Sequence, residues 1–322
     1  MDSLTQRMPF VTAFYRALGT GMVISVDSPI DDKVRSAMES LIEDYEHVLS
    51  RFRNDSLIAA IGKAEHGGSF DFPDWCAPLF DLYDALFSAT SGAIDPCVGE
   101  DLIRLGYDAS LSFTVTQDAP EHLGALRGRA VWGRDVTRHG TTLVTHEPVQ
   151  LDFGACGKGY LVDLLGRMLQ SSQFVIDAGG DLLIHAEQPI SVALEDPEDQ
   201  SHAIGIAHIA NGALCASAPS RRHWNVAVNE RTQIAIHHLL NAIDGLPAQQ
   251  TEASWAYVPA NATFNLARDY PTAVADGLAT ALFVSDVAQL QRTFDFTYAT
   301  LDESRQIAAS RNFPAELFLR SA

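Results

Sequence analysis

The feature that most limits the possible folds is a series of short strand-like segments in the second half of the chain. Apolar runs, many of them rich in branched residues, occupy residues 142–145, 174–177, 182–185, 190–194, 204–209, 234–240 and 254–258. Runs of this length between turn-forming residues are typical of strands. A doubly wound fold would place a helix after nearly every strand, and this chain does not. The order therefore predicts an α+β fold with a largely antiparallel sheet.

Segments with helical spacing lie around these strands. Apolar residues recur three and four positions apart over residues 31–52, and residues 75–89 give a second helix that ends near Gly92. A further strand is expected at 21–26. Residues 108–140 are polar and weakly periodic, which favours a surface excursion. No repeat or linker marks a boundary, so we expect residues 1–322 to form one compact, two-lobed unit with helices packed on the sheet.

The charge of the chain disfavours two classes of partner. Its 22 Lys and Arg residues face 41 Asp and Glu residues, a formal net charge of −19. Nucleic acids and anionic membranes both require a basic protein face, so neither is expected as a partner. For the same reason, a polyanionic ligand such as a nucleotide would need a bound cation.

Cysteine use and the N-terminus favour a cytoplasmic location. The four cysteines lie far apart, with neither a Cys-x-x-Cys pair nor a zinc-type Cys/His spacing, which favours reduced thiols. The first residues lack a basic start followed by an uninterrupted apolar run, and no segment is long and apolar enough to span a bilayer. We therefore expect no secretion leader and no membrane insertion.

The stretch from Leu151 to Asp163 has the pattern of a ligand-binding corner. A short apolar run gives way to small residues, and a helix begins after them with Lys158 in its first turn. Small residues let a ligand approach the backbone, and a cation at a helix start can meet an anion. The alternative is a solvated surface lysine; in the ligand-binding interpretation, replacing Lys158 should weaken ligand binding and leave the fold intact. The glycine spacing is not that of a Walker A loop or a dinucleotide fingerprint.

A second corner lies near the end of the chain. Residues 272–284 have the spacing of a helix in which Asp276 and Thr280 are four residues apart, so their oxygens lie on one face. A carboxylate and a hydroxyl on one face suit a hard cation such as Mg²⁺, which leaves coordination positions for phosphate. The alternative is a structural pair, with the Thr280 hydroxyl bonded back to a carbonyl of its own helix.

Six motifs occur in an order that resembles one known family. They are residues 18–20, 49–56, 91–99, 152–163, 177–181 and 275–283. Their order and approximate spacing are similar to those of the FAD:protein FMN transferases, the ApbE family, and the match covers roughly residues 18–290. The resemblance implies an ApbE-like fold, which is related to the T-fold.

The resemblance also implies an activity and a site. Enzymes of this family use Mg²⁺ to cleave FAD and transfer its FMN half to a Thr or Ser hydroxyl of a target protein, with release of AMP. The implied metal ligands are the backbone carbonyl of Ala155 and the side chains of Asp276 and Thr280. The residues implied to contact the flavin nucleotide are Leu18, Phe52, Ala93, Ile94, Asp95, Asp152, Lys158 and Leu240. For Phe52 the alternative is a core position at the end of the preceding helix.

A histidine pair occurs where the family carries its own histidine. Residues 236–247 resemble a His-Ile-Ile-Asp-Pro segment that ends in Gly-x-Pro, and His238 falls on the family's histidine. An imidazole of near-neutral pKa can take the proton from an acceptor hydroxyl as it attacks phosphorus, which makes His238 the candidate catalytic base. The alternative is a structural histidine at a strand end.

Two segments depart from the family and leave three functions open. Asn241-Ala242 stands in place of Asp-Pro, and residues 217–222 replace a Ser-Gly-Asp-Tyr-Glu-Arg segment, where Arg221 and Arg222 add positive charge. We therefore expect metal and pyrophosphate binding to be intact and the acceptor side to differ. The leading hypothesis is an FMN transferase acting on a protein. The alternatives are an FAD pyrophosphatase that forms FMN and AMP, and a flavin-binding protein without turnover.

Overall fold

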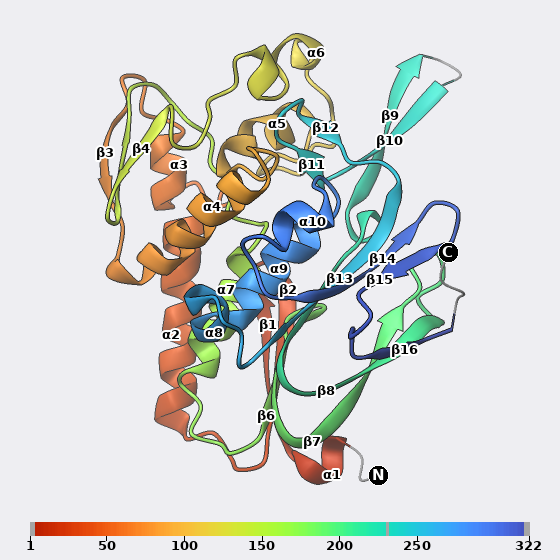
Figure 1. Ribbon diagram of the computed structural model, residues 1–322. Coiled ribbons are helices and arrows are strands. Elements are labelled where there is room, and N and C mark those ends of the chain that lie inside the picture. The colour runs from red at the N-terminus through yellow and green to blue at the C-terminus, as the bar shows by residue number, and fades with distance from the viewer. Residues whose placement is uncertain (1–3, 230–231, 319–322) are drawn as a thin grey trace.

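A large antiparallel sheet forms the centre of the molecule (Figure 1). The computed structural model describes residues 4–229 and 232–318, and within them the sheet has nine strands in the order β1-β2-β6-β7-β8-β13-β14-β15, with β16 paired to β8. The strands are β1 (Phe10–Ala17), β2 (Thr20–Val26), β6 (Phe174–Asp177), β7 (Asp181–Glu195), β8 (Ala203–Ser217), β13 (Thr251–Pro259), β14 (Thr297–Asp302), β15 (Ile307–Ala309) and β16 (Ala315–Leu317). The predicted α+β class with a largely antiparallel sheet is confirmed.

Four helices pack together on one face of this sheet (Figure 1). They are α2 (Asp32–Leu49), α4 (Ala77–Ala89), α7 (Gly157–Gly166) and α9 (Pro271–Ala281). Helix α2 begins where the Asp31 side chain accepts a hydrogen bond from the Lys33 amide, and it buries one stripe of side chains, Met38, Ile42, Tyr45 and Leu49. A second apolar core lies on strands β7, β8, β13 and β14.

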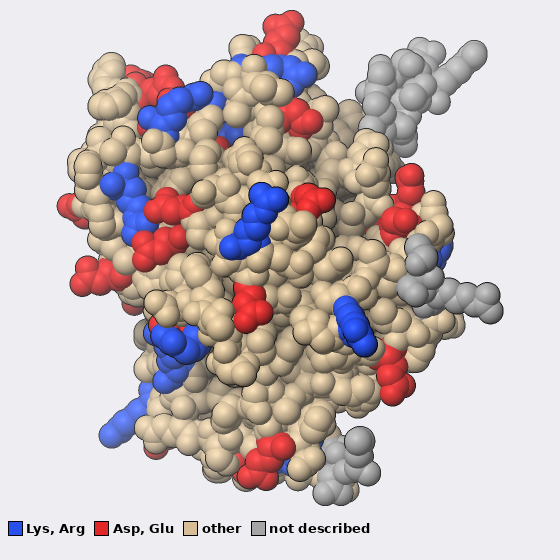
Figure 2. All heavy atoms as spheres, viewed as in Figure 1, with Lys and Arg blue, Asp and Glu red and all other residues tan. Residues whose placement is uncertain are grey.

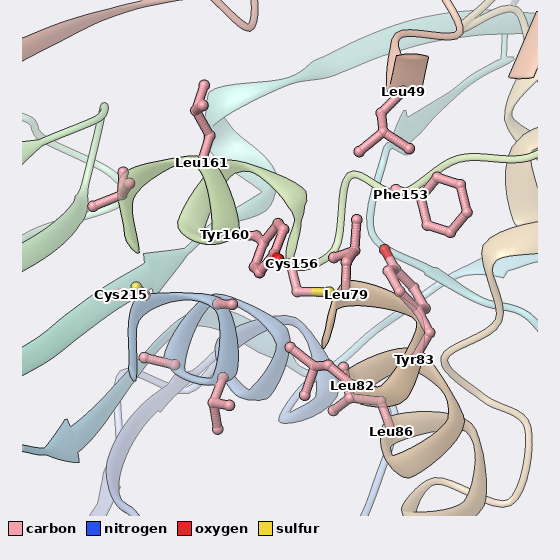
Figure 3. Close-up of a cluster of buried hydrophobic side chains, with 14 of the residues drawn as sticks. Leu49, Leu79, Leu82, Tyr83, Leu86, Phe153, Cys156, Tyr160, Leu161 and Cys215 are labelled. Carbon is pink, nitrogen blue, oxygen red and sulfur yellow. The ribbon is translucent and has the colours of Figure 1, made fainter. Parts of the chain in front are cut away.

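Close helix contacts fix the relative position of α7 and α9. A Cβ atom on Gly159 of α7 would lie 2.4 Å from the carbonyl oxygen of Thr272 and 2.9 Å from Cβ of Asp276. On α9, a Cβ atom on Gly277 would lie 2.7 Å from Leu86 of α4. Only glycine allows backbones to approach this closely. Figure 3 shows the core beside this contact, where Cys156 lies among side chains of α4 and α7, including Leu79, Tyr83 and Tyr160.

The smaller elements surround this centre. Two-stranded and three-stranded sheets are formed by β9 (His223–Asn229) with β10 (Thr232–His237), by β11 (Leu240–Asn241) with β12 (Leu246–Pro247), and by β3 (Gly68–Asp71), β5 (Thr142–Thr145) and β4 (Val136–His139). The short helices are α1 (Leu4–Arg7), α3 (Leu57–Ile61), α5 (Gly99–Arg104), α6 (Ala119–His122), α8 (Asn265–Asp269) and α10 (Val287–Leu290). In Figure 1 the β9–β10 hairpin projects from the body of the molecule.

The structure differs from the predicted surface excursion at residues 108–140. Residues 109–114 are exposed, but the later part contributes buried side chains, Ala119, Leu123, Ala130, Trp132 and Val136. Arg129 is also fully buried, with its Nε 2.8 Å from Asp101 and its Nη2 donating to the Ala242 carbonyl at 2.7 Å. The sequence pattern is polar because this segment packs through an ion pair and backbone hydrogen bonds as well as through apolar periodicity.

The distribution of charged side chains and the state of the cysteines agree with what the sequence predicts. On the face in Figure 2, Lys and Arg side chains are scattered among Asp and Glu and form no continuous basic patch. All four cysteines are buried free thiols. Among the described residues, no helix has both the length and the hydropathy needed to cross a membrane.

Candidate functional site

The two corners predicted from the sequence meet at the contact between α7 and α9. Asp276 is buried, and its Oδ2 accepts a hydrogen bond of 2.9 Å from the backbone amide of Gly159, in the first turn of α7. A helix N-terminus favours a carboxylate through its free amides and dipole. Burial raises the pKa of Asp276, and the nearby Lys158 ammonium acts in the opposite direction. The corners therefore form one site although more than a hundred residues separate them.

The hydroxyl of Thr280 points to the other segment rather than to its own helix. Its Oγ1 lies 3.5 Å from the backbone oxygen of Ala155, at the limit of a hydrogen bond. The structural alternative, a bond back to a carbonyl of α9, is not the contact that the structure has. The carbonyl of Ala155 and the hydroxyl of Thr280 thus meet, and the carboxylate of Asp276 lies one helical turn before Thr280 on α9.

Lys158 lies between two buried carboxylates. Its ammonium contacts Oδ2 of Asp181 and is 3.9 Å from Oδ1 of Asp276, while its own side chain is 27% exposed. The alternative of a freely solvated surface lysine is therefore not observed, because the ammonium lies beside two acidic groups.

The donor set fits a hard cation. Among the described residues no three His, Cys, Asp or Glu side chains gather as a metal site, so any cation here would depend on carbonyl and hydroxyl oxygens beside the carboxylate. Mg²⁺ accepts such mixed oxygen ligands and usually keeps positions for water or phosphate. Among the described residues, the buried carboxylates of Asp181 and Asp276 share the single ammonium of Lys158, so a bound divalent cation would add positive charge where the two acids face one lysine.

The α9 helix is held by a further carboxylate of α7. Asp163 accepts hydrogen bonds from the backbone amides of Thr272 and Ala273, at 3.0 and 2.8 Å. These amides lie in the first turn of α9 and have no partner within the helix. Burial raises the pKa of Asp163 to about 7. This capping contact adds to the glycine contact in fixing where Asp276 and Thr280 lie.

Asp152 is held by an arginine that the sequence analysis did not single out. Its Oδ2 contacts Nε of Arg51, and its Oδ1 accepts a 2.6 Å hydrogen bond from the Gly154 amide. The Arg51 guanidinium also lies 4.1 Å from the ring centre of Phe52. Helix α2 ends at Leu49, so Phe52 lies beyond the helix and does not continue its buried stripe. The Phe52 side chain is 40% exposed and contacts the Tyr107 ring edge to face. The alternative of a core position for Phe52 is therefore not observed.

Four of the residues implied to contact flavin are buried. They are Ala93, Ile94, Asp95 and Leu240. The Asp95 carboxylate accepts from the Cys97 amide at 2.8 Å and lies 3.5 Å from Arg129, so its side chain already has partners. A ligand could reach this loop only through its backbone. The loop does join the parts of the site, since Pro96 accepts from the Asp152 amide at 2.7 Å.

Leu18 lies at the turn between β1 and β2. Its φ is +52°, and its amide donates to Oε1 of Glu46 on α2 at 2.8 Å. It is half-buried and packs against the helix-side core. No contact in the structure brings it next to Lys158 or Asp276.

His238 follows β10, and within the part of the chain that the structure describes only one of its ring nitrogens has a hydrogen-bond partner. Its Nδ1 lies 3.2 Å from the backbone oxygen of Arg222, so this nitrogen donates and Nε2 keeps its lone pair. Burial lowers the pKa of His238 to about 4; the hydrogen bond to the Arg222 carbonyl and the charge of Asp152 act against this, while the Arg222 charge and His237 act with it. The neighbouring His237 is structural, because it is bonded to the Ala248 oxygen and to the Leu239 amide.

The departures from the family have visible consequences. Asn241 accepts from the Ile243 amide at 3.0 Å, a bond that an aspartate could also make. Ala242 donates its amide to the Ala93 oxygen at 3.0 Å, which a proline could not do. Beside this turn, a hollow of about 360 Å³ is lined by the β11–β12 hairpin and by Phe283 and Val284, which follow α9.

Comparison with known proteins decides the family. The model of the ApbE family matches residues 18–301. The chain belongs to the ApbE family. Two proteins named FAD:protein FMN transferase are similar to it: one from Klebsiella pneumoniae, 23% identical over 81% of this chain and 74% of its own length, and one from Treponema pallidum, 27% identical over 78% and 72%. The predicted family and the predicted enzyme class, a flavin transferase, are confirmed.

A solved ApbE structure has the same fold. The ApbE protein from Thermotoga maritima superposes with a TM-score of 0.77 and 20% identity, and the match covers 95% of this chain and 99% of that one. The antiparallel sheet with helices packed on one face is thus the fold of the ApbE proteins. At this identity the likeness shows the fold alone, so the roles of single residues rest on the geometry given above.

Proposed function

We propose that this ApbE protein cleaves FAD with the help of Mg²⁺ and transfers FMN to a Thr or Ser hydroxyl of a protein acceptor, with release of AMP. The observation that carries the proposal is the meeting of the Ala155 carbonyl, the Asp276 carboxylate and the Thr280 hydroxyl beside the Lys158 ammonium. The names of the relatives give FAD as the donor and a protein as the acceptor for those proteins.

The residues of the site divide into two roles. Ala155, Asp276 and Thr280 would hold Mg²⁺, which when bound neutralises the pyrophosphate and stabilises charge on the transferring phosphoryl group. Lys158 supplies a second positive charge to the same anion. His238 would accept the proton of the attacking hydroxyl at its free Nε2, since its Nδ1 is held by the Arg222 carbonyl.

The proposal is tested by incubating the protein with FAD, Mg²⁺ and a cell lysate, followed by a denaturing gel. We expect a fluorescent flavin band on an acceptor protein and one AMP for each flavin transferred. FMN and AMP in solution without a labelled band would identify the pyrophosphatase instead. Flavin binding with no AMP would identify a binding protein without turnover.

Lys158→Met should weaken FAD binding and also destabilise the protein. The substitution removes a charge from the pyrophosphate site, and it leaves the buried Asp181 carboxylate unpaired. Loss of a charge-assisted contact costs roughly ten- to hundredfold in affinity. Breaking a buried ion pair costs about 3 kcal/mol of unfolding free energy. Flavin fluorescence measures FAD binding, and urea unfolding measures stability. Parent-like values in both would mean that Lys158 is a solvated surface residue.

The transfer rate should stay level well below the usual titration range of histidine. Because the pKa of His238 is lowered to about 4, its ring is neutral and ready to accept a proton above about pH 5. As the pH falls through about 4, His238 gains a proton and the rate should fall. Rates are measured from about pH 3 to pH 8, with circular dichroism to verify folding at each pH. A rate that already falls near the ordinary histidine value of 6.5 would contradict this assignment.

Other predictions from the sequence have no test in the structure. The division of the chain as one unit and the cytoplasmic location stay predictions. The protein acceptor is named only by its chemistry, a hydroxyl side chain on a polypeptide.

A further inference from the structure

Asp181 is a fully buried carboxylate for which no role follows from the motifs. It is the first residue of β7 and follows a turn in which Gly179 and Gly180 have φ values of +67° and +104°. Such values favour glycine. The turn they form brings the Asp181 side chain next to Lys158 in the first turn of α7. Its side chain has no exposed surface.

The only charged partner that the structure gives this carboxylate, among the described residues, is Lys158. The Lys158 ammonium contacts Oδ2 of Asp181, and neither Asp181 oxygen has a hydrogen-bond donor besides it. A carboxylate buried in this way is costly unless a cation stays beside it. The pairing therefore also restrains the long and flexible lysine side chain.

The restraint places the ammonium next to the candidate cation site. With Lys158 held at Asp181, its nitrogen is 3.9 Å from Oδ1 of Asp276, while Oδ2 of Asp276 is occupied by the Gly159 amide. A lysine with four rotatable methylene groups loses much entropy when it is ordered by a ligand alone. An ammonium already fixed by a buried carboxylate loses less upon binding.

We propose that Asp181 is a positioning residue that fixes the Lys158 ammonium at the edge of the cation site, where it meets the pyrophosphate of FAD. This inference rests on the proposed function, since it takes FAD as the ligand. Asp181 itself touches no substrate and acts through Lys158.

The sign of one substitution distinguishes positioning from a simple charge effect. Asp181→Asn removes a negative charge near a polyanion, and on charge alone FAD should bind more tightly. If Asp181 positions Lys158, FAD should instead bind roughly tenfold more weakly or worse. Binding is measured with FAD and Mg²⁺ by flavin fluorescence immediately after mixing, without acceptor. Unchanged or tighter binding would overturn the proposal.

A double-mutant cycle shows whether Asp181 acts through Lys158. In the Lys158→Met background, adding Asp181→Asn should not weaken FAD binding further. Equal losses from Asp181→Asn in both backgrounds would mean that the two residues act independently, and the proposal would fail. The matched control is Asp295→Asn, the same change at an exposed residue just before β14, which should bind FAD like the parent.

Unfolding measurements give a readout that does not depend on FAD. Lys158→Met should be less stable than the parent, and adding Asp181→Asn should restore much of the loss, because no unpaired carboxylate then remains buried. Should Asp181→Asn fail to fold, Asp181→Ser leaves a smaller side chain for the same comparisons. A parent protein that binds no FAD would refute the proposed function, whereas a stability loss without rescue would refute the pairing.

Discussion

Asp276→Ala is expected to abolish measurable FAD turnover, a loss of roughly 10³-fold or more. Asp276 is the only carboxylate among the three proposed metal ligands. Its removal leaves a carbonyl and a hydroxyl to hold a divalent ion in a chain of net charge −19. AMP release from FAD measures the effect across a range of Mg²⁺ concentrations, and high Mg²⁺ should restore only part of the activity.

The control for this substitution is Asp269→Ala, which removes an exposed carboxylate of α8 just before α9 begins. It should retain the activity of the parent. Because Asp276 also accepts from the Gly159 amide, unfolding of the Asp276→Ala protein must be measured as well. Full activity of Asp276→Ala at limiting Mg²⁺ would exclude it as a metal ligand.

His238→Asn is expected to lose most FMN transfer, since a general base contributes about 10²- to 10⁴-fold to the rate. The amide of asparagine can still donate toward the Arg222 carbonyl but has no basic nitrogen to replace Nε2. FAD binding should survive, because Lys158 and the proposed metal ligands are untouched. AMP and FMN are measured with and without acceptor protein, so that the same experiment separates transfer from hydrolysis.

The matched control is His223→Asn on the neighbouring strand. His223 is exposed and pairs in register with His237, not with His238. We expect its replacement to leave transfer intact. If His238→Asn leaves every rate unchanged, His238 is structural, and the altered Asn241-Ala242 turn would then belong to a wider change of the acceptor side.

The sequence predicted correctly those helices and strands whose apolar residues recur regularly on one buried face. The strands at residues 142–145 and 174–177 were predicted to the residue, and the helix at 31–52 differs from α2 only at its ends. The two runs predicted at 182–185 and 190–194 belong to one strand, β7. Its register with β8 shifts between His185 and Ile190, and this irregularity interrupts the apolar pattern. Strand β1 was missed, since it lies at the sheet edge with a mixed and partly exposed pattern.

The site was predictable where chemistry follows local spacing. Asp276 and Thr280 share a helix face whatever the fold. The small residues before Lys158 predict that a helix begins there. Asp181 and Arg51 were missed because their importance comes from partners far away in the sequence. Burial of Arg129 was equally invisible, since a polar segment gives no sign that its arginine meets Asp101 in the interior.

The glycine contact between α7 and α9 fixes the position of the site through backbone atoms, whereas side chains carry its chemistry. Backbone meets backbone at Gly159, so the spacing of the two helices does not depend on the side chains that face a ligand. A residue such as Thr280 can then change during evolution or design while the frame stays in place. A site built in this way can acquire a new acceptor, or lose turnover and keep its ligand, through a few exchanges on an unchanged scaffold.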